Sequence, residues 1–210
     1  MACWVGLMGP QDRIDLALDA IQRLVEDLGR RDCVFVFIGD GECLSSLRAR
    51  VHEMGIERWV RFTGWLEEHD CFSFLASADL GFDPNLQPEV TPVKGMEYMA
   101  FSLPFVAFDL PETRAMATDG AMLVAPGDVT AFACAIDGLL DDPEGRELMG
   151  EKGRRRVEDE LAWDRQKEGY LEVFADALTS RPANGGPEPL KEILRGDADR
   201  ARQDLEVSGP

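Results

Sequence analysis

The sequence predicts an α/β domain of the Rossmann-like, doubly wound class, in which helices cover both faces of a parallel sheet. Short apolar runs alternate with longer amphipathic segments along most of the 210 residues, and this alternation is typical of repeated strand–helix units. The run at residues 34–38 has no polar residue, as expected for a central parallel strand that is buried on both faces. Several of the apolar runs end in glycine or aspartate, which favour tight turns.

Helical spacing begins after Gly9, where apolar residues recur every three or four positions. The apolar set of this expected helix is Ile14, Leu16, Leu18, Ile21, Leu24 and Leu28. A strand at residues 3–6 precedes it. The next expected elements are a strand at 34–38, a helix at about 42–54, a strand at 59–62, a helix at about 67–77 and a strand at 78–82.

A loop, helix and strand at residues 84–108 form the centre of the second half. Thr91 suits an N-cap and Pro92 the first helical position, so a helix is expected from Pro92 to about Phe101. Strands at 105–108 and 121–124 and helices at about 129–141, 144–159 and 163–178 should follow. These elements predict one domain over residues 1–178. Residues 179–210 are rich in proline, glycine and charge, which predicts a disordered tail.

Charge and composition argue against several classes of protein. The net charge is −18, from 22 Lys and Arg residues against 40 Asp and Glu residues, which disfavours a broad nucleic-acid surface. No apolar run approaches the length of a membrane span, and the first residues lack the basic and apolar regions of a signal peptide. The five cysteines and two histidines show no metal-ligand spacing, so we expect reduced thiols, no metal site and a cytoplasmic protein.

Lys94 falls in the first turn of the expected helix at Pro92, where a cation costs roughly 0.3–1 kcal/mol because the helix dipole is positive there. That cost is understandable if an anion, most naturally a phosphate, lies between the lysine and the free backbone N–H groups. Glu97 lies three residues further on, near the same helix face, and Glu89 lies in the preceding loop. The alternative is a buried Glu97 paired with Lys94 in an ordinary doubly wound domain.

The order of these residues resembles a known family. Glu89 and Glu97 are separated by seven residues, and they are followed by Tyr98-Met99-Ala100 and by the sequence LPFVA at 103–107. This pattern resembles the acidic motif of retaining glycosyltransferases that use nucleotide sugars. More narrowly, the chain resembles the C-terminal, donor-binding domain of the GT-B fold in the family 4-like glycosyl transferases group 1. The resemblance covers about residues 4–178.

The resemblance implies roles for the residues of this motif. Glu97 would accept hydrogen bonds from the nucleotide ribose, and Glu89 would contact hydroxyls of the donor sugar. Lys94 would offset the charge that develops on the leaving diphosphate, with Thr91 and Val93 as further donor-binding residues at the start of its helix. Glu89 and Lys94 are therefore the expected catalytic residues. The donor substrate would be a nucleotide-diphosphate sugar, transferred with retention of configuration and without a cofactor or bound metal.

Two glycines after the strand at 34–38 are further donor-binding candidates. In Gly39-Asp40-Gly41, the turn resembles a Gly-Asp-Gly that follows the second strand of the same domain in the family. A dinucleotide-binding fingerprint would need glycine where this chain has Leu44. The pattern therefore disfavours a nicotinamide or flavin site and favours Gly39 and Gly41 as part of a donor site.

The loop at residues 6–15 departs from the commonest family pattern. Many members carry an arginine and a lysine that hold the diphosphate, at the positions of Leu7 and Asp12 in this chain. The chain instead resembles a branch with Gly-x-Met-Gly-x-Gln-Asp, in which backbone N–H groups of the loop would contact phosphate. Gly9, Gln11 and Arg13 are the donor-binding candidates here, although Arg13 is also explained as a solvated helix residue.

A GT-B enzyme has two such domains with the reaction in the cleft between them, and this sequence resembles one of them. We therefore expect the chain to bind a nucleotide sugar but not to transfer the sugar alone. Its partner would be a separate N-terminal acceptor-binding domain or subunit, and membrane contact would come through that half, if at all. Two alternatives stay open, namely a truncated, non-catalytic relic or partner subunit, and a nucleotide-sugar epimerase-like domain.

Overall fold

The fold is that of a computed structural model, which describes residues 1–89 and 91–179. The chain divides into two compact units, Met1–Gln166 and Lys167–Pro210. The first unit contains the whole sheet. The described part of the second unit is the continuation of one helix, and the disorder predicted for the tail lies outside the described residues, apart from residue 179.

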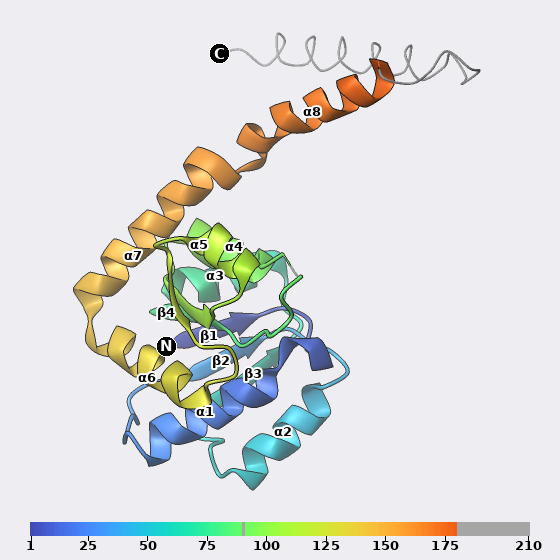
Figure 1. Ribbon diagram of the computed structural model, residues 1–210. Coiled ribbons are helices and arrows are strands. Elements are labelled where there is room, and N and C mark those ends of the chain that lie inside the picture. Colours follow the sequence, from blue (N-terminus) through green and yellow to red (C-terminus); the bar gives the residue numbers. More distant parts are fainter. Residues whose placement is uncertain (90, 180–210) are drawn as a thin grey trace. The chain divides into compact units, whose positions relative to one another are not determined.

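One six-stranded, fully parallel sheet forms the centre of the first unit, with the strand order β3-β2-β1-β4-β5-β6 (Figure 1). The strands are β1 Ala2–Val5, β2 Phe35–Ile38, β3 Val60–Gly64, β4 Leu80–Asp83, β5 Phe105–Phe108 and β6 Ala121–Val124. The order reverses between β1 and β4, whose following helices cover opposite faces. This arrangement confirms the Rossmann-like, doubly wound class.

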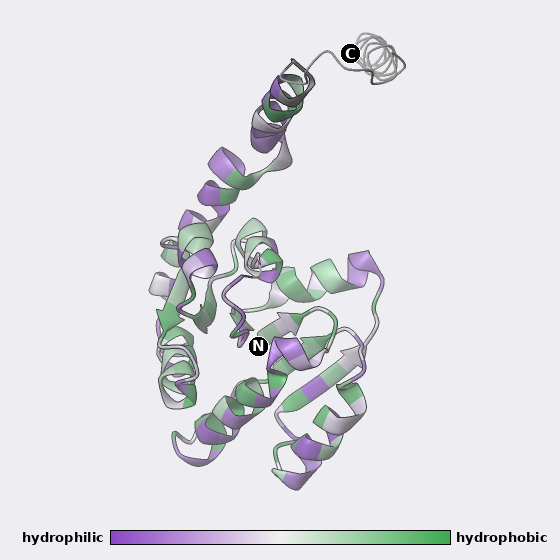
Figure 2. Ribbon diagram, turned by 45° about the vertical axis from the view of Figure 1, so that its right-hand side comes forward, coloured by the Kyte–Doolittle hydropathy of each residue, from purple (hydrophilic) through white to green (hydrophobic). Residues whose placement is uncertain are grey.

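The described residues form eight α-helices. They are α1 Ile14–Glu26, α2 Leu44–Glu53, α3 Glu68–Ser77, α4 Val93–Ala100, α5 Pro111–Ala117, α6 Val129–Asp141, α7 Pro143–Arg156 and α8 Trp163–Thr179. Buried residues of α1, α2 and α6 share one core cluster, and those of α3, α4 and α5 share the other. Figure 2 shows hydrophilic and hydrophobic residues alternating along α1 and α2, as expected for helices with one buried face.

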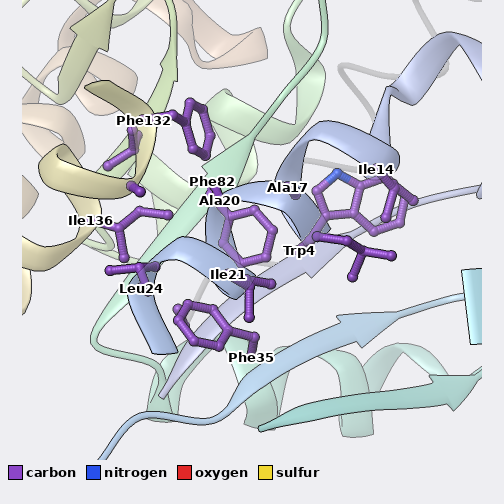
Figure 3. Close-up of a cluster of buried hydrophobic side chains, with 14 of the residues drawn as sticks. Trp4, Ile14, Ala17, Ala20, Ile21, Leu24, Phe35, Phe82, Phe132 and Ile136 are labelled. Atoms are coloured by element: carbon purple, nitrogen blue, oxygen red, sulfur yellow. The ribbon is translucent and has the colours of Figure 1, made fainter. Parts of the chain in front are cut away.

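The apolar face of α1 fills much of the first core. Ile14, Ile21 and Leu24 are at most 2% exposed, and they lie against aromatic side chains of the strands, including Trp4 and Phe35 (Figure 3). Complete burial of one such aliphatic side chain contributes roughly 1.5–3 kcal/mol. Leu28, which the spacing placed in this set, lies beyond the end of the helix and is 46% exposed. That part of the prediction is wrong because the helix ends at Glu26.

Several elements differ from the sequence-based expectation. The expected N-cap at Thr91 is wrong: α4 has Pro92 as its N-cap, in a non-helical conformation and without a side-chain cap. The helix at 144–159 ends earlier, at Arg156, and a π-helical turn at Val157–Leu161 follows it. Helix α5 was not expected, although Pro111 stands at its first position, where proline favours helix initiation.

No helix within residues 1–89 and 91–179 combines the length and apolar character that a membrane crossing requires.

Arg13 has a strained backbone, with φ of +50° at the start of α1. A left-handed conformation costs a residue with a side chain roughly 1–2 kcal/mol relative to glycine. The ion pair of Arg13 with Asp15 is partly exposed and contributes at most about 1 kcal/mol. We expect Arg13→Gly to raise the free energy of unfolding by about 0.5–1 kcal/mol, measured by urea denaturation. Arg23→Gly, in the interior of α1 and also removing an ion pair, should instead lower it by about 1 kcal/mol.

Candidate functional site

The loops that leave β1, β2 and β3 are joined by backbone hydrogen bonds at the carboxyl edge of the sheet. Met8 N–H donates to the Asp40 carbonyl at 2.8 Å, and Gly39 N–H donates to the Gly64 carbonyl at 3.1 Å. These bonds continue the pairing of the sheet past the ends of the strands. The edge where ligands bind in doubly wound folds is therefore built from fixed loops.

Two glycines allow these loops to approach so closely. A Cβ atom on Gly39, which has φ of +128°, would lie 2.0 Å from the carbonyl oxygen of Gly6. A Cβ atom on Gly41, at φ of +155°, would lie 2.6 Å from backbone atoms of Met8. Both positions were predicted as donor-binding residues, and the structure gives each of them a role in holding the β1 and β2 loops together.

Tyr98 fixes α4 against the sheet. Its side chain is fully buried, and its hydroxyl accepts from Val5 N–H at 3.3 Å and donates to the Phe82 carbonyl at 3.2 Å. Gly81 makes room for the ring, because a Cβ there would lie 2.7 Å from it. With Tyr98 held in this way, Lys94 and Glu97, which precede it on the helix, are presented to the carboxyl edge of β1 and β2.

Lys94 crosses the edge of the sheet from α4 to the loop before α1. Its Cε lies 2.9 Å from where a Cβ of Gly6 would be, and its Nζ lies 5.2 Å from the centre of the Trp4 ring. The Nζ donates to Asp12 Oδ1 at 2.7 Å. The described ion pair of Lys94 is therefore with Asp12, and not with Glu97 as in the alternative interpretation.

Asp12 is the anion that Lys94 contacts. It ends a short 3₁₀ helix, Pro10–Asp12, is 5% exposed, and its Oδ2 accepts from Gly9 N–H at 3.1 Å. A second carboxylate, Asp83 at the end of β4, is also buried. Burial raises the pKa of Asp83, Lys94 opposes this shift, and the negative charge of Asp12 adds to it. One lysine thus lies among two buried carboxyl groups.

Glu97 borders a pocket of about 460 Å³ at the same edge. The pocket is lined by Val5, Gly6, Leu7, Ile38, Gly39, Trp65, Leu66, Glu68, Cys71, Phe72 and Glu97. Its walls come from the ends of β1 and β2, from the loop after β3 and from α3 and α4. The surrounding protein raises the pKa of Glu97 by desolvation, and the nearby Lys94 opposes part of that shift. A carboxylate at the mouth of a mostly apolar pocket can accept hydrogen bonds from a ligand's hydroxyl groups.

The structure brings together only some of the predicted site residues. Gly39 and Glu97 line the pocket, and Lys94 lies beside it across Gly6. Glu89 is exposed in the loop before α4. The other predicted residues at the start of that helix, Thr91 and Val93, are exposed too, and Val93 N–H donates to the Thr91 carbonyl at 2.9 Å.

The predicted residues of the β1 loop lie to one side of this pocket. Gly9 lines a different pocket of about 430 Å³ between α1 and α2, and the exposed Gln11 folds its side chain back over Gly9. Arg13 donates to both carboxylate oxygens of Asp15, at 3.0 and 2.9 Å. This pairing raises the pKa of Arg13 and lowers the pKa of Asp15, so the guanidinium is engaged on its own helix.

Sequence reasoning missed several residues of the site. Trp65, 71% exposed, and Phe72 line the pocket, and their only signal was the position of Trp65 directly after Gly64. Asp12 is a departure from the commonest family pattern, and the sequence did not predict it as a site residue. Among the residues that the structure describes, no group of three or more His, Cys, Asp or Glu side chains is placed to hold a metal ion.

Comparison with known proteins identifies the family to which this sequence belongs. The family model described as glycosyl transferases group 1 matches residues 1–142. The chain belongs to this family. This confirms the resemblance on which the site residues were predicted.

Two named glycosyltransferases are similar to the chain over most of its length. It is 30% identical over 164 residues to the GDP-mannose-dependent monoacylated alpha-(1-6)-phosphatidylinositol monomannoside mannosyltransferase of Corynebacterium glutamicum, covering 74% of this chain and 42% of the relative. It is 29% identical over 150 residues to the alpha-D-kanosaminyltransferase of Streptomyces kanamyceticus, covering 70% and 38%. The chain therefore spans about two fifths of the length of these relatives.

Solved glycosyltransferases share the fold. The structure of Anabaena HepE in complex with UDP-glucose superposes with a TM-score of 0.72 at 18% identity, over 83% of this chain and 48% of that one. A glycosyltransferase from Rickettsia africae gives a TM-score of 0.74 at 15% identity, over 86% and 48%. These neighbours confirm the predicted Rossmann-like half of a GT-B architecture for this member of the group 1 family.

Proposed function

We propose that this chain binds the donor of a retaining glycosyltransferase, a nucleotide-diphosphate sugar, at the carboxyl edge of its sheet. The observation that carries the proposal is that Glu97 lines a pocket at this edge together with Gly6 and Gly39, while Lys94 lies beside the pocket against Gly6. A cation, a hydroxyl acceptor and an apolar pocket are the groups that a diphosphate, a ribose and a base require.

Lys94 is the group that would act on the diphosphate. An ammonium has three N–H donors, and Asp12 takes one of them, so two are left for phosphate oxygens. As the glycosidic bond breaks, negative charge builds up on the diphosphate, and a fixed cation beside it lowers the barrier. Lys94 is held in place before the ligand arrives by Asp12 and by the Trp4 ring, so little reorganisation accompanies the reaction.

The carboxylates would orient the rest of the donor. Glu97, at the mouth of the pocket, would accept from the ribose hydroxyls, and the apolar walls beside Trp65 would cover the base. Glu89, in the exposed loop, would contact the sugar hydroxyls. Anabaena HepE, which shares the fold, was solved in complex with UDP-glucose, and this supports a ligand of the same chemical class.

The acceptor would be bound elsewhere. Because the chain spans 38% and 42% of two relatives that transfer sugars, we propose that a separate N-terminal domain or subunit supplies the acceptor site. The isolated chain should then bind donor and transfer no sugar. Turnover by the isolated chain with any acceptor would contradict this part of the proposal.

Calorimetric titration tests the proposal. UDP, GDP and ADP, and then UDP-glucose and GDP-mannose, are titrated into the full chain, and one base series should bind. Glu97→Ala should weaken that binding by about 10- to 100-fold, since a hydrogen bond to a charged group contributes roughly 1.5–3 kcal/mol. The matched control is Glu151→Ala, which removes an exposed glutamate paired with Arg155 on α7 and should leave the affinity unchanged. If no nucleotide binds, the alternative of a non-catalytic relic is favoured.

A further inference from the structure

The buried carboxylate of Asp12 lies beside Lys94, the residue proposed to bind phosphate. Asp12 is 5% exposed and accepts from Lys94 Nζ at 2.7 Å and from Gly9 N–H at 3.1 Å. A hydroxyl or amide could accept the same bond from Gly9, so this local hydrogen bond does not require a carboxylate. What a carboxylate adds is a charge that neutralises Lys94.

The charge balance of this part of the site is unfavourable for a highly charged anion. Lys94 contributes one positive charge, and Asp12 opposes it at 2.7 Å. Asp83, buried at the end of β4, interacts with both of them. Repulsion between Asp12 and a bound phosphate is weakly screened because the carboxylate is buried, and it increases with each additional charge on the ligand.

The two ligands that a donor site meets in one reaction cycle differ in charge. In a nucleotide-diphosphate sugar, both phosphates are esterified and carry one negative charge each. In the free nucleoside diphosphate the terminal phosphate has a second ionisation with a pKa near 6, so it carries about one further negative charge at pH 8. Any nearby fixed charge must therefore discriminate between the donor and the leaving nucleotide.

We propose that Asp12 is a specificity-determining residue of the donor site, because its buried carboxylate, paired with Lys94, disfavours the additional charge of a free nucleoside diphosphate relative to the sugar-bearing donor. The inference rests on the proposed function. Because of this discrimination, the site releases the leaving nucleoside diphosphate more readily than a site with Lys94 and no Asp12 would. For one extra charge at roughly 7 Å and an effective dielectric constant of about 40, the discrimination is about five- to ten-fold.

Neutral variants at position 12 test this discrimination. Calorimetry at pH 8 gives the dissociation constants of UDP and UDP-glucose, or of GDP and GDP-mannose if that base series binds, for the full chain and for Asp12→Asn and Asp12→Ser. Serine and asparagine can both accept from Gly9 N–H, so the loop is expected to persist, which thermal melting checks. In both variants the free diphosphate should gain about five- to ten-fold more affinity than the sugar-bearing donor. Asp19→Asn, which neutralises a carboxylate of α1 that pairs with Arg50 of α2, should leave the ratio of the two constants within two-fold.

The outcomes separate the inference from the function on which it rests. If the unmodified chain binds neither ligand, the proposed function is wrong and this inference falls with it. If it binds both and the ratio stays constant in the neutral variants, the function survives and the role of Asp12 is overturned. The unmodified chain supplies a second test, which is independent of how the variants fold: its affinity for the free diphosphate should not exceed its affinity for the sugar-bearing donor. A free diphosphate that binds more tightly than the sugar-bearing donor would also overturn the inference.

Discussion

Gly39→Ala is expected to lower the free energy of unfolding by more than about 4 kcal/mol, which is exceptional for one methyl group. The added Cβ would lie 2.0 Å from the Gly6 carbonyl oxygen, and no side-chain rotation relieves the clash, because the backbone fixes the positions of both atoms. Relief of the clash would separate the β1 and β2 loops and break the bond from Gly39 N–H to the Gly64 carbonyl. The backbone φ of +128° adds strain for any residue with a Cβ. Since domains are stable by roughly 5–15 kcal/mol, this substitution should remove a large part of the total stability.

Urea denaturation followed by circular dichroism measures this loss without any ligand. The matched control is Gly29→Ala, because Gly29 also has a positive φ, +73°, but its Cβ would meet no atom within 4 Å. That variant should lose only about 1–2 kcal/mol, the cost of the left-handed conformation. Equal losses in the two variants would show that the close approach of the loops is not what Gly39 provides.

Lys94→Met should weaken nucleotide-diphosphate binding by at least about 100-fold. The substitution removes a charge-assisted hydrogen bond to phosphate, worth roughly 1.5–3 kcal/mol. It also leaves Asp12, 5% exposed, as an unpaired negative charge that repels the ligand. Breaking a buried ion pair costs roughly 3–5 kcal/mol, so stability should fall as well, although the 20% exposure of the Lys94 side chain places the loss at or below the lower end of that range.

Two further variants separate binding from folding. Lys152→Met removes a lysine from an exposed pair with Asp119, and it should change neither stability nor affinity measurably. Asp12→Asn combined with Lys94→Met removes both charges of the pair and should recover most of the stability but not the affinity of the unmodified chain. Normal affinity in Lys94→Met would rule out Lys94 as the phosphate-binding group.

Much of the fold could be predicted because each strand is a short apolar run with a turn behind it. The strands at 105–108 and 121–124 have the expected bounds, since glycine, proline or aspartate lies close to both of their ends. Helix α5 escaped prediction because its seven residues, Pro111–Ala117, are too few to establish a helical period. At Thr91 the local signal for an N-cap was misleading, because Pro92 itself has a non-helical ψ of 67°.

The candidate site was predicted less completely because its contacts are non-local. Local spacing was sufficient to select Lys94 and Glu97, which lie one helical turn apart. The partner of Lys94 is 82 residues away, and no periodicity connects Asp12 to α4. The same reason applies to Gly39, whose need for glycine comes from the carbonyl of Gly6 and therefore from a different strand.

The path of Lys94 over the sheet edge also limits how this chain can diverge. A single side chain joins the loop after β1 to the helix after β4, so each of these segments supplies the counter-charge of the other. A neutral substitution at position 12 alone or at position 94 alone leaves the charge of the other residue without its partner. The two positions are therefore energetically coupled, even though one follows β1 and the other follows β4.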